Sequence, residues 1–445
     1  MKTQGLPEGE SVSTMRLSEW AVFWIAAALA LLTHGSYWVL DHEHEAVDTA
    51  TYLIPADNLV HGLGFVNARH EPELRRTPGY PLVLAVFRTG PLRVEYVIVA
   101  QHLLCVLLAG AVALAGWKMS GSRAVAFGAA AAFSLDLATI RIANLLMTEV
   151  MAMTLVALTA WSMYRGMTRL EGRTRWIILA GILGGCGTLV RPVGSLYFVP
   201  LSLCLVLAWK GRSMRPVLIL GASFLLLPVL WATRNYVEGQ YLGISTIGAE
   251  DILYYRAAGA LAIEQPGSYL ENARLMNGKL IGQTCGDLER IYKANCSTVS
   301  EAKQAAYATR KGVSIILSHP LSYVRSMAVS VAYIIFGGGA EALSRISNLN
   351  PGMAERIVLL ITLPEALLAV AGCWYWYRRD RNLFYVLVLT VGYFFAVSAG
   401  AEAYSRFRVP VMPMYALLAG GGAEWAIQAI LGSIRRRAAP IEASR

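Results

Sequence analysis

The sequence predicts an all-α, polytopic integral membrane protein, a bundle of about ten to twelve transmembrane helices. Three observations predict this class. Hydrophobic residues make up 56% of the 445-residue chain and charged residues only 15%, whereas soluble domains have about 25% charged residues. The apolar residues form long runs without a polar face, and the charged residues are clumped between these runs. A large soluble α/β core would need polar faces, so the sequence indicates one transmembrane domain over residues 1–445.

The apolar runs approach the roughly 20 residues that a bilayer-spanning helix needs. They cover residues 18–40, 94–117, 123–140, 146–164, 176–190, 193–209, 216–233, 321–338, 356–377, 383–400 and 409–432. The first run is longer than the apolar region of a cleaved signal peptide. We therefore expect it to remain as an anchor.

The net charge of +10 is gathered in short basic clusters between the runs. These clusters are Lys118 and Arg123; Arg165, Arg169, Arg173 and Arg175; Lys210, Arg212 and Arg215; Arg378, Arg379 and Arg381; Arg435, Arg436 and Arg437. Basic loops stay in the cytoplasm, which explains the charge without a nucleic-acid partner. The pattern predicts the N-terminus inside and loops 41–93, 141–147, 190–193 and 234–320 outside.

The topology after residue 320 contains a conflict. Strict alternation after a span at 321–338 would place the basic cluster 378–381 outside, whereas its charge places it inside. One segment must therefore be re-entrant, broken or not a span. Segment 321–338 is the candidate, because it follows a polar helix-like stretch and ends in Gly337-Gly338-Gly339. On this interpretation the C-terminus is inside.

The first outer loop, 41–93, is long enough to carry function. It contains two amphipathic stretches, at 52–63 and 81–87, in which apolar residues recur at helical spacing. Helices of this kind lie along the membrane surface with the apolar face down. The sequence therefore predicts two surface helices in this loop.

The second large outer loop, 234–320, is mixed and polar, and its pattern predicts a helix at 300–318. It also holds Cys285 and Cys296 in the segment CGDLERIYKANC. Two cysteines in an oxidising compartment can close a short loop. We expect a disulfide between them, because no other Cys or His lies nearby to complete a metal site.

Acidic and histidine residues gather directly after the first span. Ionisable groups at a membrane are costly, so each is a hypothesis of function. Asp48 stands at the start of the first surface helix, where it either caps the helix or serves as a general base. His44 and Glu45 could bind a divalent metal, but their spacing matches no metal motif. The alternative for these two residues is a solvated polar loop, and no cofactor is required.

Five arginines lie at the expected outer ends of spans or in the first loop: Arg76, Arg191, Arg234, Arg406 and Arg408. Arg76 belongs to a turn with two prolines and a glycine, which holds its direction. A guanidinium matches a phosphate geometrically. Outward arginines oppose the positive-inside tendency, so each needs an anionic partner, and several together favour an anionic ligand such as a lipid phosphate.

The alternative partners of these arginines are carboxylates of the same chain. Glu149, Glu238 and Glu402 are the candidates. Glu149, at the outer mouth of its span, either balances an arginine such as Arg191 or supplies a second acid to the site.

Six short motifs recur in an order that resembles a known family. They are D-x-x-x-Y (Asp48, Tyr52), R-T-P-G-Y-P-L (Arg76 to Leu82), T-E at 148–149, L-V-R-P at 189–192, W-x-x-R-N at 231–235 and R-F-R-V-P-x-M-P at 406–413. In this series the chain resembles the dolichyl-phosphate-mannose protein mannosyltransferase-like, or aminoarabinose transferase-like, glycosyltransferases of the GT-C fold. The likeness extends over nearly the whole chain.

The resemblance implies a sugar donor linked to a polyprenyl phosphate and chemistry on the outer face of a bacterial-type inner (plasma) membrane. It assigns the catalytic role to Asp48. The leaving phosphate develops charge that fixed guanidiniums stabilise, and the candidates are Arg76, Arg234, Arg406 and Arg408. Supporting roles fall to Tyr52, Tyr80, Glu149 and Arg191. The acceptor is a lipid, a glycan or a protein, and direct displacement predicts inversion at the sugar C1.

The sequence departs from the protein mannosyltransferases at two points. Thr49 follows Asp48 where those enzymes often have an acid, and the second loop has no inserted sugar-binding domain. These departures argue against protein O-mannosylation.

Two other functions fit part of the pattern. A transporter or flippase of a lipid-linked sugar would use the arginines but would need no general base. A ligase that moves a whole glycan from a diphosphate carrier predicts a different donor.

Overall fold

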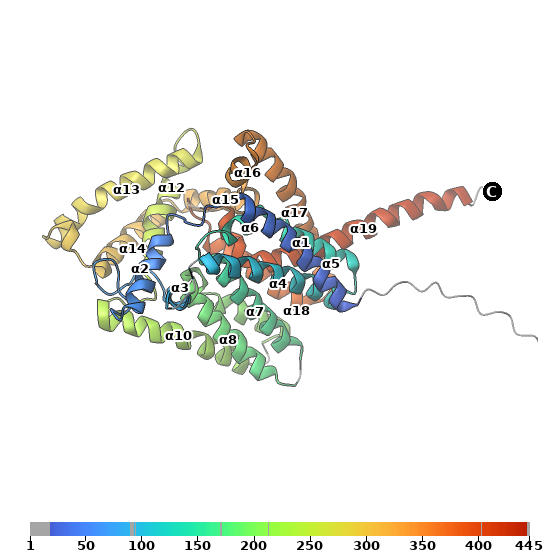
Figure 1. The fold of residues 1–445 in the computed structure, drawn as a ribbon, viewed down its shortest axis with the longest axis horizontal. Helices are drawn as coiled ribbons and strands as arrows, with labels where there is room; N and C mark the ends of the chain where they lie inside the picture. The colour runs from blue at the N-terminus through green and yellow to red at the C-terminus, as the bar shows by residue number, and fades with distance from the viewer. Residues whose placement is uncertain are drawn as a thin grey trace, which may run out of the picture.

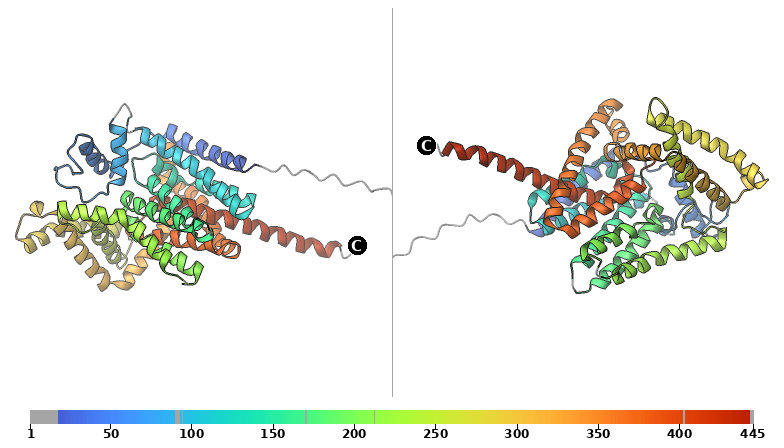
Figure 2. Two further views of the ribbon diagram at one scale, coloured as in Figure 1. Left: turned by 90° about the horizontal axis from the view of Figure 1, so that it is seen from below. Right: turned by 180° about the vertical axis from the view of Figure 1, so that it is seen from behind.

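The computed structural model describes residues 18–89, 93, 95–169, 171–211, 213–401 and 403–442, with the backbone alone for 434–442. The described residues form helices joined by turns, and one isolated β-bridge pairs Val66 with Pro72. The all-α fold expected from the sequence is therefore confirmed. The helices pack into a bundle with two distinct ends, as Figures 1 and 2 show.

The basic end of the bundle is defined by contacts among the predicted basic clusters. Arg379 donates a hydrogen bond of 2.6 Å to the carbonyl of Ser120. The hydroxyl of Tyr164 donates to Asp380 at 2.8 Å, and Arg173 lies over the ring of Trp209. Cluster 378–381 therefore lies with the earlier basic clusters, as its charge predicted. Arg212 and the side chains of 435–437 are outside the described residues.

The loop end, opposite to the basic end, carries the segments predicted to be outer loops. Asn144 donates to the carbonyl of Asp41 at 2.9 Å, and Gln101 donates to the carbonyl of Leu145 at 2.8 Å. Helices α2 (Thr49–Val60), α13 (Tyr269–Tyr292) and α14 (Glu301–Ser318) gather here, while α19 (Met412–Glu442) projects from the basic end (Figure 1).

Ten helical passes of the described chain lead from one end to the other. They are α1 (Glu19–Leu40), α4 (Glu95–Ser120), the pair α5 (Arg123–Ser134) and α6 (Leu137–Ala143), α7 (Glu149–Thr168), α8 (Arg173–Val190), α9 (Phe198–Trp209), α10 (Arg215–Gly239), α17 (Pro351–Arg379), α18 (Arg381–Val397) and α19 (Met412–Glu442). An even number of passes places the start of α1 and the end of α19 on the same side, as expected.

Length and apolar composition alone give a smaller number of spans. Six described segments qualify, and a seventh qualifies if the bent pair α5 and α6 is one span. The other passes are shorter or more polar: α18 has 17 residues, α8 begins Arg-Thr-Arg and contains four glycines, and α19 carries Glu424 and Gln428. Glycines of α8 pack against α10, and Glu424 of α19 accepts a hydrogen bond from Ser122, so these residues have contacts within the protein.

Segment 320–347 is long and apolar enough for a span but does not run between the two ends. It consists of α15 (Pro320–Phe336) and α16 (Ala340–Ser347). Near its middle Ser330 donates to the carbonyl of Gly400 at 2.8 Å, and Arg345 in α16 pairs with Glu43. Both contacts lie at the loop end. Helix α15 itself is continuous from Pro320 to Phe336, so 321–338 is not a broken span. The chain turns back after it, at Gly338 and Gly339, whose φ angles are positive.

The two loops of the loop end are helical. Loop 41–93 forms α2 and α3 (Gly79–Arg88), as the amphipathic stretches predicted. Residues 247–318 form α11 (Ile247–Glu250), the π-helix η2 (Asp251–Ala257), α12 (Ala258–Ala262), α13, the short η3 (Cys296–Thr298) and α14. Cys285 and Cys296 form the expected disulfide, which ties the end of α13 to η3.

The return of α15 and α16 to the loop end makes a testable topology. We expect Ser318→Cys and Ser347→Cys to react with a membrane-impermeant maleimide from the same side of sealed vesicles. Ser213→Cys, between α9 and α10, should react only from the opposite side. All three serines are exposed. Reaction of positions 318 and 347 from opposite sides would show that the segment crosses the membrane.

Candidate active site

A cavity of about 650 Å³ opens at the loop end. Small-molecule sites commonly have volumes in this range. Its walls come from loop 41–93, the turn after α8, the segment 244–256, α14 with the start of α15, and the chain between α18 and α19. Segments that are hundreds of residues apart in the sequence therefore meet in one place.

Asp48 occupies the N-cap position of α2, but its carboxylate makes no cap hydrogen bond there. It lies between two guanidiniums instead. Nη2 of Arg76 is 2.7 Å from Oδ1, and Nη1 of Arg406 is 3.4 Å from Oδ2. Asp48 thus stands at the N-cap position, but its side chain does not cap the helix. About a quarter of the Asp48 side chain, 27%, stays exposed, on the cavity wall.

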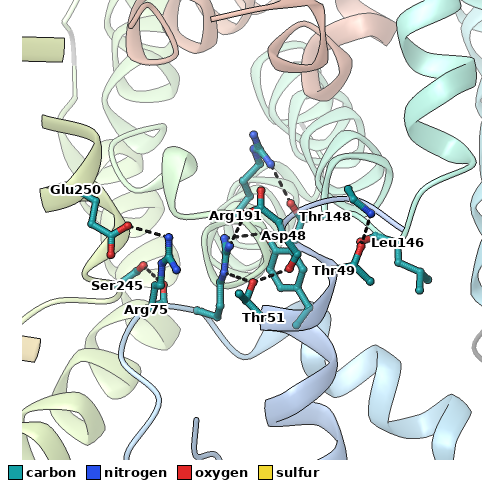
Figure 3. Close-up of polar contacts among 12 residues, drawn as sticks. Asp48, Thr49, Thr51, Arg75, Leu146, Thr148, Arg191, Ser245 and Glu250 are labelled. Atoms are coloured by element: carbon teal, nitrogen blue, oxygen red, sulfur yellow. Dashed lines mark hydrogen bonds and ion pairs between the residues drawn. The ribbon is translucent and has the colours of Figure 1, made fainter. Parts of the chain in front are cut away.

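Arg76 is held on every edge of its guanidinium. Besides Nη2 on Asp48, Nε donates to Oγ1 of Thr51 at 2.9 Å and Nη1 donates to the Tyr52 hydroxyl at 3.0 Å. The guanidinium carbon lies 4.5 Å from the centroid of the Tyr52 ring. Only 6% of the side chain is exposed. Figure 3 shows Asp48 and Thr51 within this network of contacts.

The backbone around Arg76 explains its fixed direction. The Glu73 carboxylate accepts the backbone N–H groups of Arg75 at 2.7 Å and Arg76 at 2.8 Å. Two residues later the chain enters α3 through Pro78 and Gly79. A Cβ at Gly79 would lie 2.7 Å from the carbonyl oxygen of Leu189, so only glycine allows this close approach to α8. The turn therefore holds the backbone of Arg76 in a fixed position, as the two prolines predicted.

Arg191 lines the cavity, and Glu149 lies behind it. Glu149 is fully buried at the start of α7, and its Oε1 lies 2.9 Å from Nη1 of Arg191. Arg191 also donates to Oγ1 of Thr148 at 2.9 Å (Figure 3). Nε of Arg406 is 3.8 Å from the same Glu149 oxygen. Glu149 therefore balances two arginines, which confirms one of the alternatives drawn from the sequence; Glu402 lies outside the described residues.

The cavity lining is electropositive. Five arginines and three carboxylates line it, a net charge of +2. They are Arg75, Arg76, Arg191, Arg256 and Arg406, with Asp48, Glu250 and Asp251. Low-dielectric walls strengthen such a field. The lining is therefore suited to a dianionic or monoanionic group such as a phosphate.

The two aspartates of the cavity differ in acidity. Burial raises the pKa of the Asp48 carboxyl, but the Arg76 and Arg406 guanidiniums outweigh burial and leave the pKa below its usual value. Burial raises the pKa of Asp251 to about 6, against the opposing charge of Arg256. Asp48 is thus ionised over the physiological range, whereas Asp251 titrates near its lower edge.

Two predicted phosphate ligands lie away from the cavity. Arg234 donates to the carbonyls of Glu73 at 2.9 Å and Phe65 at 2.7 Å, and so ties the first loop to α10. Arg408 is fully buried, pairs with Asp136 and donates to the carbonyl of Ile334. Both guanidiniums have structural partners outside the cavity lining. The structure therefore does not bring Arg234 and Arg408 together with Arg76 and Arg406.

Tyr52 and Tyr80 form an aromatic floor under Arg76. Their rings meet edge to face with centroids 5.4 Å apart, and the Tyr80 hydroxyl donates to Gln101 at 2.9 Å. Tyr52 lines the cavity, and Tyr80 lies behind it. Tyr52 therefore contacts Arg76 directly, whereas Tyr80 packs against Tyr52.

The metal alternative has no ligand set in the described part of the chain. No group of three or more His, Cys, Asp or Glu side chains there is arranged to hold a metal ion. Nδ1 of His44 lies 3.1 Å from the carbonyl oxygen of Asn144, and Glu45 is absent from the cavity lining. The polar-loop alternative describes these residues better.

Several cavity residues were not identified from the sequence. Arg75 pairs with Glu250 at 2.9 Å across 175 residues (Figure 3), and Asp251 and Arg256 belong to the π-helix η2. π-Helical turns are frequent at functional sites, but no local sequence pattern predicts the π-helix η2. Only the adjacent acidic residues Glu250 and Asp251, which follow an apolar stretch, could have indicated that this segment contributes to a site.

The fold and the cavity define an all-helical membrane protein with an arginine-rich site at one end of its bundle. No protein-family model matches the chain, and no curated protein matches it significantly. Among solved structures the chain is similar to the apo oligosaccharyltransferase of Archaeoglobus fulgidus, with 12% identity, a TM-score of 0.48, and coverage of 92% of this chain and 51% of that chain. The chain thus spans about half the length of that protein.

The chain is also similar to ArnT from Cupriavidus metallidurans bound to undecaprenyl phosphate. The identity is 14% and the TM-score 0.42, with coverage of 90% of this chain and 78% of that chain. Both proteins are GT-C fold glycosyltransferases, the group that the sequence motifs resemble. Similarity at this level carries no information on donor or acceptor.

The buried Glu149–Arg191 pair predicts a large stability effect. Glu149→Gln removes one charge and leaves Arg191 unbalanced, and loss of one partner of a buried pair costs about 3–5 kcal/mol. Glu341→Gln is the matched control, since Glu341 is 86% exposed and lies 3.6 Å from Arg141. Its cost should be below about 1 kcal/mol. Thermal unfolding of the purified proteins in detergent checks this, and equal melting temperatures for both variants would contradict it.

Proposed function

We propose that this chain is a membrane glycosyltransferase that moves a sugar from a polyprenyl-phosphate-linked donor to an acceptor hydroxyl, with inversion at C1. One observation carries the proposal: the Asp48 carboxylate lies between Arg76 and Arg406 on the wall of an open, electropositive cavity. This arrangement offers a proton acceptor and an anion site within the reach of one substrate.

The arginines suit the leaving phosphate. Breaking the bond between the sugar C1 and the phosphate oxygen leaves an electron pair on that oxygen. Fixed guanidiniums aimed at such developing charge need no reorganisation during the reaction. Arg76 and Arg406 are fixed by their carboxylate, hydroxyl and aromatic contacts. Arg191 adds a third positive charge on the same wall.

Asp48 is the proton acceptor in this proposal. The acceptor hydroxyl attacks C1, its proton passes to the Asp48 carboxylate, and the polyprenyl phosphate departs with the bonding electrons. In the donor-free site the two arginines keep Asp48 weakly basic. A bound phosphate competes for the same guanidiniums and adds negative charge beside Asp48, and both effects raise the pKa of its carboxyl. Donor binding therefore activates the base.

The apolar part of the lining suits a lipid-linked donor. Leu196, Val313, Ile316, Tyr393 and Val397 also line the cavity. Tyr393 and Val397 belong to the last turns of α18, and Leu196 lies just before α9, so a chain bound there continues along a pass of the bundle. A lipid carrier would enter from the bilayer and place its phosphate at the arginines.

The location of the site follows from charge. Basic loops stay in the cytoplasm, which puts the basic end there and the loop end, with the cavity, on the outer face. We place the protein in a bacterial-type plasma membrane. The acceptor is an outer lipid, glycan or protein.

The decisive experiment measures release of polyprenyl phosphate from a panel of polyprenyl-phosphate sugars, with cell-envelope acceptors present. Wild type should release it, and Asp48→Asn should lose about 100-fold or more of the rate, the usual contribution of a general base. Asp57→Asn is the matched control on the same helix, because Asp57 pairs with Arg88 outside the cavity.

Each outcome has a clear meaning. Equal release by wild type and Asp48→Asn would remove Asp48 from the mechanism. Donor binding without release, in a protein that instead moves the lipid-linked sugar across vesicles, would establish a transporter or flippase. Release of a diphosphate carrier from a whole-glycan donor would establish a ligase.

If donor binding activates Asp48, the acid limbs of the pH profiles of kcat/KM and kcat should differ. The acid limb of kcat/KM reports the free protein. There the pKa of Asp48 lies below its usual value of about 3.9. The limb of kcat, which reports the donor complex, should therefore lie at a higher pH than the limb of kcat/KM. The profiles are best compared in Asp251→Asn, which removes the other titrating aspartate. Coincident limbs would contradict activation by the donor.

A further inference from the structure

A second hollow, of about 500 Å³, lies at the basic end, away from the site described above. We refer to it as the basic-end pocket. Its walls come from the turn between α4 and α5, the last turns of α17 and the middle of α19. The lining residues are Ser120, Gly121, Ser122, Trp374, Tyr375, Arg378, Arg379, Glu424, Trp425 and Gln428.

The close contact of α17 with α19 forms the base of this pocket. A Cβ at Gly372 would overlap the carbonyl oxygen of Leu418, and one at Gly422 would overlap that of Leu368. Small residues of this kind let helices touch backbone to backbone. Beyond this contact α19 continues out of the bundle, as Figures 1 and 2 show. Concavity at this point therefore follows from the packing of the two helices.

One carboxylate and two guanidiniums line the pocket, which leaves one positive charge in excess. The Glu424 carboxylate accepts hydrogen bonds from Ser122 at 2.6 Å and Gln428 at 2.5 Å. Arg379 donates to the Ser120 carbonyl and fixes the rim. Glu424 is thus satisfied by neutral donors and leaves the arginines uncompensated by an ion pair.

Arg378 is the residue available to a ligand. Its guanidinium carbon lies 5.0 Å from the centroid of the Trp374 ring. Among the described residues it makes no ion pair or hydrogen bond. Its N–H donors therefore point to solvent or to a bound anion, while the ring beneath holds its direction.

Two exposed tryptophans mark the depth of the pocket in the membrane. Trp374 is 54% exposed and Trp425 is 45% exposed. Tryptophan is enriched at the level of the lipid headgroups, where its ring is half in apolar surroundings. Basic pockets between transmembrane helices on the cytoplasmic side bind anionic headgroups. The pocket thus lies at headgroup depth and carries the charge that a phosphodiester would neutralise.

We propose that the basic-end pocket binds the phosphodiester headgroup of an anionic phospholipid, and that Arg378 is the main residue that contacts the phosphate. A soluble anion would need no tryptophan belt, and a zwitterionic lipid would leave the excess positive charge unneutralised. The site is independent of the cavity at the loop end and of the function proposed for it.

The test is lipid binding to the purified full-length protein by native mass spectrometry. Delipidated protein in detergent is titrated with phosphatidylglycerol and, separately, with phosphatidylcholine. Wild type should bind phosphatidylglycerol more tightly. Arg378→Ala should weaken this binding about tenfold, the loss of one hydrogen bond to a charged group. Arg378→Lys should keep part of it, since a lysine retains the charge but not the fork.

The matched control is Arg381→Ala. Arg381 belongs to the same basic cluster and also lies over an aromatic ring, that of Tyr377, but it is not part of the pocket lining. Its removal should leave the affinity for phosphatidylglycerol within about twofold. Equal losses in Arg378→Ala and Arg381→Ala would overturn the proposal, because they would indicate a general basic surface.

Two further outcomes would also overturn it. The first is equal affinity of wild type for phosphatidylglycerol and phosphatidylcholine. The second is displacement of the lipid by millimolar inorganic phosphate, which would identify a soluble anion as the ligand.

Discussion

The contact of Asp48 with Arg76 and Arg406 is the interaction on which the loop end depends. Asp48 and Arg406 are separated by 358 residues along the chain. The carboxylate thus joins the first loop to the segment before the last helix, and Glu149 joins that segment to Arg191 after α8. Removing the carboxylates would leave three arginines in mutual repulsion at a partly buried site. The cavity keeps its shape because a carboxylate lies between each pair of neighbouring arginines.

The same alternation explains how arginines are kept at the end of the bundle that is expected to lie outside. An outward arginine opposes the positive-inside tendency, and each of the five arginines singled out from the sequence has an internal partner. Arg234 and Arg408 have theirs away from the cavity, in backbone carbonyls and in Asp136. Arg76 and Arg406 have theirs on the cavity wall, where a phosphate could replace Asp48. Arginines whose partners lie away from the cavity are structural, whereas those whose partners lie on the cavity wall are placed where a ligand could bind.

Sequence reasoning found the fold, the two helices of the first loop, the helix at 300–318, the disulfide and the fixed direction of Arg76. Each of these depends on composition or on residues close in sequence. It could not separate Arg408 from Arg406, because residues two apart in a 3₁₀ segment face different neighbours: one the buried Asp136, the other the cavity. It also missed Arg75, Glu250 and Asp251, whose meeting depends on α11 packing against the first loop.

The even number of passes and the return of α15 and α16 follow from one constraint. Both the basic cluster 378–381 and the earlier clusters must lie on one side, while Arg345 reaches Glu43 on the other. A crossing at 320–347 would break one of these pairings. The chain avoids it at Gly338 and Gly339, where a Cβ would overlap Ser405 or lie 2.7 Å from the Leu137 side chain. Close packing there brings the segment before Arg406 against α15, so the return of the chain also positions the arginine that faces Asp48.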